Sequence, residues 1–411
     1  MRFLITCFFA MAIGSSIVVS AKPSEFEGTK INAAKISVSS LPLGQAFRIT
    51  FNWTGSPMPS DYTVWMNILN SSGKTVFKED HSLPGGIKTT SWNGNVSYTR
   101  LIRVSDTLLN GKYEIVAGLL DRSKKTRVEI SPGQGVTAGA DKGYVIGSFM
   151  LDSKAPMPPL DSEKKKTLNL KGYKVTFREE FDGPLDISAW GPGTKWIAHT
   201  PYAGDFGDAK FTDPEPGFPF TVSKGLLKIE ARKEGDKWKS GLICSVDKQG
   251  NGFAQQYGYF EMRAKFPKGP GTWPAFWLLA LRKLKDKSDY GFEVDIIEQY
   301  GREPNIMHSV LHWWPPERDG HKSIGNKFYL PDMYKDFHTY GFMWDEETMI
   351  WYFDGVELWR QPTPEESKTP MYVLVNLALG PAWPLDKTPN PSIMEVDYVR
   401  VYTKEAKISE N

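Results

Sequence analysis

The chain has 411 residues, with 50 lysines and arginines against 48 aspartates and glutamates, which gives a formal net charge of +2. No basic stripe runs among the aromatic residues, so this balance argues against nucleic acid as a partner. The sequence also shows no internal repeat, phosphate-binding glycine loop or Ser/His/Asp nucleophile motif.

Residues 1–21 are typical of a secretory signal peptide. Arg2 precedes an apolar run over residues 3–13, and Val19-Ser20-Ala21 forms a small-residue end before Lys22. The apolar run is too short for a convincing transmembrane helix, and Cys7 lies too early for a lipid-attachment cysteine. We therefore expect a secreted or periplasmic protein without a permanent membrane anchor. After cleavage Cys244 is the remaining cysteine, so no intramolecular disulfide can form.

Residues 22–152 contain short segments of alternating apolar and polar residues, separated by Gly, Asn and Ser turns. Examples are residues 46–53, 62–69 and 111–119, and their spacing predicts an immunoglobulin-like β-sandwich accessory domain. This domain either binds carbohydrate through exposed indoles or acts as a spacer whose indoles pack the core. The residues concerned are Trp53, Trp65 and Trp92.

Residues 153–171 are predicted to be a linker, because a proline-rich stretch at 155–160 precedes a charged stretch at 161–166. From residue 172 to 404 short β-prone runs, such as 225–230 and 349–353, alternate with Gly, Pro and Asp turns. Long amphipathic helices are absent from the pattern. The sequence therefore predicts an all-β protein.

Three carboxylates fall within six residues of a β-prone segment, in Glu293-Val294-Asp295-Ile296-Ile297-Glu298. In a regular strand Glu293 and Asp295 share one face, while Glu298 falls on the apolar face with Val294. An unpaired carboxylate on the buried face costs several kcal/mol. A β-bulge at Ile296-Ile297 resets the parity, so we predict that all three acids lie on one face.

Two carboxylates on one strand face can perform glycoside hydrolysis. Their side chains can lean together to a separation of about 5 Å, which is the gap that retaining glycosidases use. One then attacks the anomeric carbon and the other protonates the leaving oxygen. A central aspartate hydrogen-bonded to the nucleophile holds its orientation. The alternative is an exposed strand with three solvated acids, which the intervening apolar residues disfavour.

The acidic segment resembles the catalytic signature of family 16 glycoside hydrolases, in the form with the extra bulge residue. Further segments match that family in the same order over residues 172–404. They are residues 177–183, 258–263, 271–277, 337–340, 353–355, 376–380 and 396–402. The resemblance implies a concanavalin-like β-jelly roll of two curved antiparallel sheets. It also implies Glu293 as nucleophile, Asp295 as its helper and Glu298 as general acid/base.

Tryptophans lie close to the acids in the sequence, and sugar rings stack on indoles. The resemblance places Trp273 and Trp313 at a substrate cleft, and we expect substrate contacts from Trp277 and Trp314 as well. Core packing is the alternative role for each. His312 matches a histidine that the family keeps in its cleft, so we expect it to bind substrate or orient the nucleophile.

His308, His312 and His321 also suggest a metal site, but a His-x-x-x-His spacing on a strand spans ~13 Å, too far for one zinc ion. We therefore expect no cofactor for catalysis. The family often carries a structural calcium ion, and the resemblance places Glu180 and Asp397 where they would hold it.

The leading hypothesis is an endo-acting retaining β-glycosidase that hydrolyses a polysaccharide, with a β-1,3- or β-1,3/1,4-glucan as first choice, and acts as a monomer. The bulged motif and the segment 371–377 also resemble depolymerases of bacterial exopolysaccharides such as succinoglycan and of marine galactans. Sulfated galactans would require cations such as Arg302, Arg318 and Lys322. A non-catalytic sugar-binding protein on the same fold predicts loss of one of the paired glutamates, and both are present.

Overall fold

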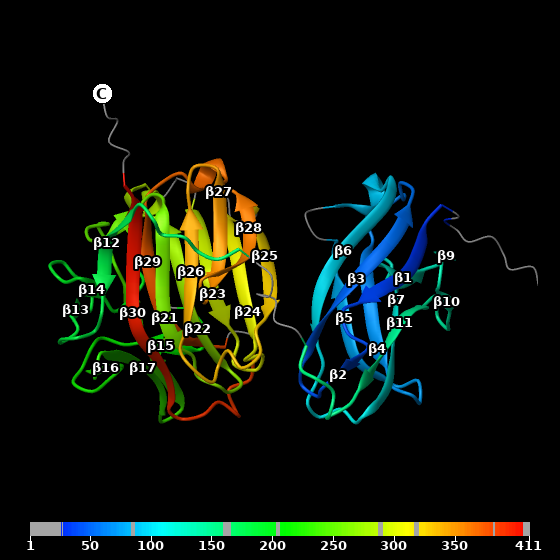
Figure 1. The fold of residues 1–411 in the computed structure, drawn as a ribbon, viewed down its shortest axis with the longest axis horizontal. Helices are drawn as coiled ribbons and strands as arrows, with labels where there is room; N and C mark the ends of the chain where they lie inside the picture. Colours follow the sequence, from blue (N-terminus) through cyan, green and yellow to red (C-terminus); the bar gives the residue numbers. More distant parts are fainter. Residues whose placement is uncertain are drawn as a thin grey trace, which may run out of the picture. The chain divides into compact units, whose positions relative to one another are not determined.

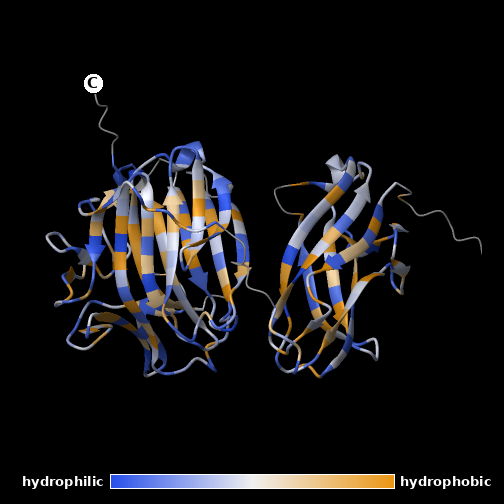
Figure 2. Ribbon diagram, in the orientation of Figure 1, coloured by the Kyte–Doolittle hydropathy of each residue, from blue (hydrophilic) through white to orange (hydrophobic). Residues whose placement is uncertain are grey.

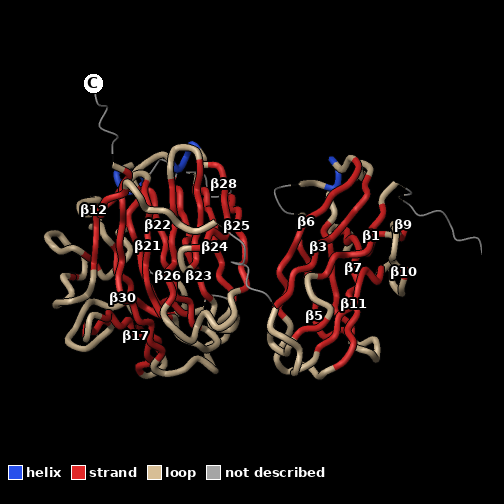
Figure 3. The backbone as a smooth tube through the Cα atoms, in the orientation of Figure 1, coloured by secondary structure: helices blue, strands red, loops and turns tan. Residues whose placement is uncertain are grey.

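The structure is a computed structural model that describes residues 26, 28–83, 87–158, 166–202, 206–286, 291–315, 320–380 and 383–405. Strands dominate these residues, and helices are confined to short turns (Figure 3). The short helices are η2 (Thr89–Ser91), α1 (Arg282–Lys285) and η4 (Glu365–Ser367). The all-β prediction is therefore confirmed. Within the described residues, no helix combines the length and apolar character needed to cross a membrane.

The first eleven strands form two sheets (Figure 1). The first sheet has the order β6 (Gly94–Arg103), β3 (Ala46–Gly55), β1 (Lys30–Ile36), β9 (Ser131–Pro132). The second has the order β10 (Thr137–Ala138), β11 (Tyr144–Leu151), β7 (Gly111–Asp121), β4 (Thr63–Leu69), β5 (Thr75–His81), with β2 (Ser40–Leu41) on β11 and β8 (Thr126–Val128) on β7. The immunoglobulin-like assignment and the domain boundaries remain predictions.

The tryptophans of this first region fill its interior. Trp53, Trp65 and Trp92 are 1%, 3% and 1% exposed, and the rings of Trp53 and Trp92 pack 5.4 Å apart. The guanidinium of Arg127 lies over the Trp65 ring, 3.7 Å from its centre. Because buried indoles offer no face to a sugar, carbohydrate binding through these three residues is contradicted, and their packing role is confirmed.

The remaining strands form two larger sheets. The ten-stranded sheet has the order β15 (Ala209–Phe211), β18 (Lys237–Ser240), β17 (Leu226–Glu234), β30 (Ser392–Lys404), β21 (Gly258–Lys265), β26 (His338–Trp344), β27 (Thr348–Phe353), β28 (Val356–Pro362), with β12 (Tyr173–Glu179) on β30 and β16 (Phe220–Ser223) on β17. The nine-stranded sheet has the order β13 (Ile187–Ser188), β14 (Trp196–Ile197), β19 (Leu242–Cys244), β29 (Met371–Leu379), β22 (Thr272–Ala280), β23 (Gly291–Gln299), β24 (Ile306–Trp314), β25 (Lys322–Tyr329), with β20 (Ala254–Gln255) on β29.

One apolar core joins the two larger sheets. It combines residues such as Phe260 and Trp351 of the ten-stranded sheet with Phe276, Val294 and Val375 of the nine-stranded sheet, all of them fully buried. Pairing in both sheets is antiparallel except at the marginal pairs β13–β14 and β15–β18. The alternation of apolar and polar residues along these strands is visible in Figure 2. The two packed antiparallel sheets confirm the predicted jelly-roll sandwich.

The part of the predicted linker that the structure describes after residue 165 packs on the ten-stranded sheet. The amide of Leu168 donates to the carbonyl of Gly355, and Leu168 and Leu170 pack against the buried rings of Tyr259 and Tyr352. Residues 159–165 lie outside the described residues, as does the predicted signal peptide. The segment just before β12 is thus part of a packed domain.

Candidate active site

Strand β23 carries the acidic segment and contains the predicted bulge. On one side Phe276 of β22 pairs with Ile297 while Trp277 pairs with Asp295, so Ile296 has no partner on β22. On the other side, β24 shows a shift in register between Asp295 and Glu298. Both neighbouring strands therefore confirm one extra residue at Ile296-Ile297.

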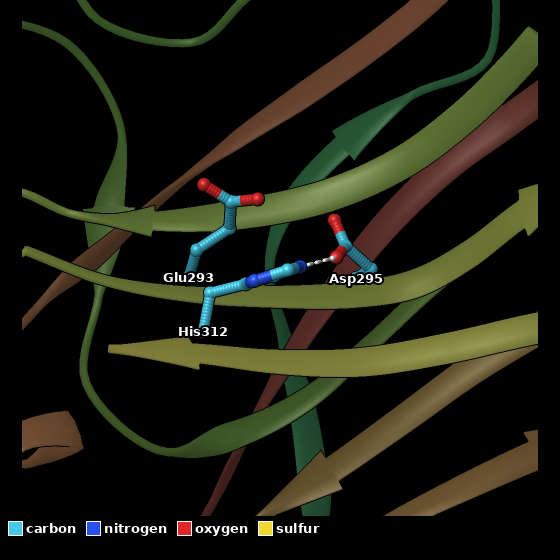
Figure 4. Close-up of side chains that lie close together, drawn as sticks. All are labelled: Glu293, Asp295 and His312. Carbon is cyan, nitrogen blue, oxygen red and sulfur yellow. Dashed lines mark ion pairs between the residues drawn. The ribbon is translucent and has the colours of Figure 1, made fainter. Parts of the chain in front are cut away.

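The bulge places two consecutive isoleucines in the core. Ile296 and Ile297 are both 0% exposed and belong to the core between the sheets. The acids therefore share the other face of the sheet: Glu293 and Glu298 are half-buried there, and Asp295 is buried. Figure 4 shows Glu293 and Asp295 together with His312 of β24.

Side chains on both sides of the sandwich satisfy the bulged backbone. The Oγ of Ser309 donates to the carbonyl of Ile296 at 2.9 Å. The Nε1 of Trp351, which comes from β27 in the opposite sheet, donates to the carbonyl of Asp295 at 3.2 Å. Because a buried carbonyl without a partner costs about 1–3 kcal/mol, these two donors stabilise the kink.

Glu293 accepts a hydrogen bond from an exposed tryptophan. The Nε1 of Trp314 lies 3.0 Å from its Oε2, and Trp314 is 37% exposed. Glu293 pairs directly with His312 across β23 and β24, so the two side chains share a face. This carboxylate is oriented by a neighbour and remains accessible from solvent.

Glu298 is held by two donors on one oxygen. The Nε1 of Trp273 donates to its Oε1 at 2.8 Å, and the hydroxyl of Tyr300 donates to the same atom at 3.2 Å. The rings of Trp273 and Tyr300 stack with their centres 6.0 Å apart. His308, which pairs with Glu298, meets the Tyr300 ring edge-on at 4.8 Å. The second oxygen of Glu298 is the natural position for a transferable proton.

Asp295 lies between the two glutamates in sequence and contacts His312. Its Oδ2 is 3.1 Å from the Nε2 of His312, and both side chains are largely buried. The predicted set Glu293, Asp295, Glu298 and His312 is thus brought together on one sheet face.

Burial raises the pKa of all three acids. The pKa of Glu293 rises to about 8, because burial and the charge of Asp295 outweigh the opposite effects of His312 and the Trp314 N–H. Burial and then the charge of Glu298 raise the pKa of Asp295 well above its usual range. Burial also raises the pKa of Glu298, against the hydrogen bonds from Trp273 and Tyr300. The acids therefore do not all ionise together at neutral pH.

The raised pKa of Glu293 predicts that Glu293→Gln stabilises the protein at high pH. A carboxyl whose pKa is raised on folding contributes stability below its unfolded pKa of 4.5, and that contribution is lost as pH rises through about 8. The variant should therefore melt several degrees above the wild type at pH 9 and close to it at pH 4.5, at ~2–4 °C per kcal/mol. Calorimetry at both pH values measures this difference. The exposed Glu215→Gln is the control, and an equal gain at both pH values would contradict the prediction.

The remaining predicted aromatics divide between the two faces of the sheet. Trp277 lies on the face of the acids but is only 5% exposed; its Nε1 donates to Asn376, and Phe206 covers it edge-on at 5.8 Å. Trp313 points to the core and meets Phe292 edge-on at 5.2 Å. The expectation that Trp313 lies with the acids is therefore wrong, because it is one residue out of step with His312 and Trp314 on β24.

Sequence reasoning missed several residues of the site. Tyr202 keeps 37% of its surface exposed, and its pKa is raised first by burial and then by the charge of Glu293. Tyr202 and Phe206 lie in a turn-rich stretch without periodicity, so the sequence carried no signal for them. Tyr300 was detectable, because it follows Glu298 by two residues and so continues the same face.

One group of three metal-ligand types lies close together within the described ranges. Single ligand atoms of Glu293, Asp295 and His312 are all within 4.8 Å of one another, near enough to hold a metal ion together. The spacing of His308 and His312 had excluded a metal held by both histidines. Only His312 belongs to this group, and His308 does not.

Glu180 and Asp397 do not fit the predicted calcium site. Both oxygens of Glu180 accept from Arg400, at 2.9 and 2.8 Å, and Arg400 lowers the pKa of Glu180. The Oδ2 of Asp397 lies 2.5 Å from the Nη1 of Arg263. Guanidinium groups already neutralise these two carboxylates and would repel a cation there.

Comparison with known proteins identifies the family to which this β-sandwich, with its cluster of carboxyl groups, belongs. The family model described as "Glycosyl hydrolases family 16" matches residues 220–400. A beta-glucanase of Rhodothermus marinus is 32% identical over 206 residues, which cover 44% of this chain and 69% of that protein. The chain belongs to family 16 of the glycosyl hydrolases.

Two other relatives are longer than the part that matches. The endo-1,3-1,4-beta-glycanase ExsH of Rhizobium meliloti (strain 1021) is 37% identical over 199 residues, covering 46% of this chain and 40% of that protein. The glucan endo-1,3-beta-glucosidase A1 of Niallia circulans is 27% identical over 313 residues, covering 65% of this chain and 44% of that protein. The chain thus spans less than half the length of each.

Proposed function

We propose that this protein is an endo-acting retaining β-glycosidase that hydrolyses a polysaccharide by double displacement. The observation that carries the proposal is the bulge in β23, which puts Glu293, Asp295 and Glu298 on one face with separate hydrogen-bond partners. Membership of the family supports it. Two carboxylic groups with different partners can take the two roles that the reaction requires.

In the first step, ionised Glu293 attacks the anomeric carbon and forms a glycosyl ester, while protonated Glu298 gives its proton to the leaving oxygen. Trp314 holds Glu293 in position through its Nε1, and Trp273 and Tyr300 hold Glu298. In the second step, Glu298 accepts a proton from water, and that water displaces Glu293 from the sugar. The raised pKa of Glu298 favours its protonated form before the first step. The pKa of Glu293, raised to about 8, makes the ionised form of this residue the minor one at neutral pH, so the first step proceeds from that fraction.

A β-1,3- or β-1,3/1,4-glucan is the proposed substrate. The relatives are named as a beta-glucanase, an endo-1,3-1,4-beta-glycanase and a glucan endo-1,3-beta-glucosidase, which supports this class. Aromatic side chains on the acid face, with Trp314 and Tyr202 exposed, offer stacking surfaces for glucose rings. We further propose that the protein is exported through residues 1–21 and acts as a monomer in the periplasm or outside the cell.

An anionic polysaccharide is the second candidate, such as a bacterial exopolysaccharide or a sulfated galactan. The guanidinium of Arg302 lies 3.9 Å from the centre of the Trp383 ring, and this ring lies 6.5 Å from that of Tyr300 beside Glu298. A cation at this position would favour a substrate with acidic groups. Lys322 is exposed on β25, and Arg318 lies outside the described residues.

Digestion of a polymer panel tests the proposal. Purified protein incubated with laminarin, lichenan, agarose and a bacterial exopolysaccharide should release reducing ends from laminarin or lichenan first. Proton NMR of the earliest products should show the retained β configuration. Release only from the acidic polymer would favour the second candidate. Binding without new reducing ends from any polymer would indicate a sugar-binding protein, and inverted product would contradict the double displacement.

A further inference from the structure

A second histidine contacts His312 on the side away from Asp295. The Nδ1 of His312 lies 2.9 Å from the Nε2 of His321, an exposed residue just before β25. The Nε2 of His312 faces the Oδ2 of Asp295 at 3.1 Å. Both ring nitrogens of His312 therefore have a partner, and the three side chains form a line from a buried carboxyl group to an exposed ring.

The proton positions along this line depend on one another. Two ring nitrogens at hydrogen-bond distance share one proton, because two bare nitrogens or two N–H groups would repel. In a neutral His312 ring, donation of the Nε2–H to Asp295 leaves Nδ1 bare, so His321 supplies the shared proton from its Nε2. A doubly protonated His312 would instead donate from Nδ1 to His321 as well. The opposite arrangement, with the proton on Nδ1 of His312, leaves its Nε2 bare and requires Asp295 to be protonated.

We propose that His321 is a positioning residue of the active site: its Nε2–H donates to Nδ1 of His312 and thereby keeps the other N–H of that ring directed at Asp295. The inference rests on the proposed function, with Asp295 in the role of helper to the nucleophile Glu293 that the family resemblance implies. Because a carboxyl group keeps acceptor lone pairs when it is protonated on its other oxygen, a fixed N–H donor holds Asp295 in one orientation in either protonation state. The sequence analysis grouped His312 and His321 only as candidate metal ligands, because their hydrogen bond joins residues nine positions apart in the chain.

Ring stacking is the competing explanation for His321. Its ring stacks on that of Trp314, with centres 4.0 Å apart and planes 20° apart, and Trp314 in turn donates to Glu293. On this explanation, His321 acts only as a flat surface under Trp314. The two explanations predict opposite results for two substitutions.

The pair His321→Gln and His321→Phe separates hydrogen bonding from stacking. The amide nitrogen of glutamine lies about as far from the backbone as Nε2 of histidine and can donate, while phenylalanine keeps the ring and has no donor. We expect His321→Phe to lower kcat on the preferred polymer of the panel about tenfold with KM unchanged. His321→Gln should keep most of the wild-type kcat. Wild-type activity in His321→Phe, or an equal loss in both variants, would overturn the proposal.

A second measurement needs no substrate and so tests the pairing separately from the proposed reaction. The chain has six histidines, so the full-length protein labelled with ¹⁵N-histidine gives a simple spectrum. We expect a ¹⁵N–¹⁵N coupling across the hydrogen bond between His312 and His321, with the proton attached to Nε2 of His321. This coupling should vanish in His321→Phe. No coupling in the wild type, or a proton attached to Nδ1 of His312, would overturn the proposal.

Discussion

Glu293→Ala should reduce polysaccharide turnover by roughly three orders of magnitude or more, because the covalent intermediate can no longer form. Azide should restore reaction of an aryl β-glycoside by occupying the space of the missing carboxylate. It then attacks the face opposite the leaving group once, so the expected product is the α-glycosyl azide. Glycosidase assays with and without azide, followed by NMR of the product, measure both effects.

The fold of this variant should survive, since Glu293 is half-buried and its hydrogen bond comes from the exposed Trp314. Circular dichroism and the melting temperature provide the control for folding. Unchanged turnover would end the assignment of Glu293 as nucleophile. A β-glycosyl azide from this variant would instead assign Glu293 to proton transfer.

Glu298→Ala should produce a loss of similar size on polysaccharide, with a different substrate dependence. A sugar leaving group needs a proton, whereas an aryl leaving group with a low pKa does not, so formation of the intermediate from an aryl glycoside should be largely spared. Azide should then attack the glycosyl ester on Glu293, and two successive inversions give the β-glycosyl azide. The burst of aryl alcohol and the configuration of the azide are the measurements.

A control for Glu298→Ala is Tyr300→Phe, which removes one of the two donors to Oε1 and leaves Trp273 in place. It should change activity far less than loss of the carboxyl group. An equal loss on polysaccharide and aryl substrates in Glu298→Ala would contradict the general acid/base role.

The bulge and the acid face could be predicted because they follow from local parity. In an unbroken strand Glu298 would point into the core, and burying its carboxylate there would be energetically costly. That cost is what predicts the bulge from the sequence. The same reasoning did not extend to Trp313, which lies on the core face of β24, one position from His312. Resemblance placed it at the cleft, while simple alternation with His312 would have placed it correctly.

Contacts between distant segments could not be predicted. The guanidinium of Arg400 on β30 donates to Glu180, which directly follows β12, the strand that pairs with β30. Such contacts depend on how loops and strands meet in three dimensions, which a local pattern does not encode. The arginine partners of Glu180 and Asp397, the residues expected to hold calcium, could not be foreseen for this reason, because they come from other strands.

Trp351 gives the sandwich a mechanical link between its layers. Its indole N–H, which comes from β27 of the ten-stranded sheet, donates to the carbonyl of Asp295 on β23. The ten-stranded sheet therefore helps to fix the backbone of β23 between Glu293 and Glu298. Sliding of one sheet over the other would change the length of this hydrogen bond. The positions of the two glutamates therefore depend in part on Trp351, a buried side chain that does not contact the substrate. The same indole contributes to the stability of the fold and to the rate of the reaction.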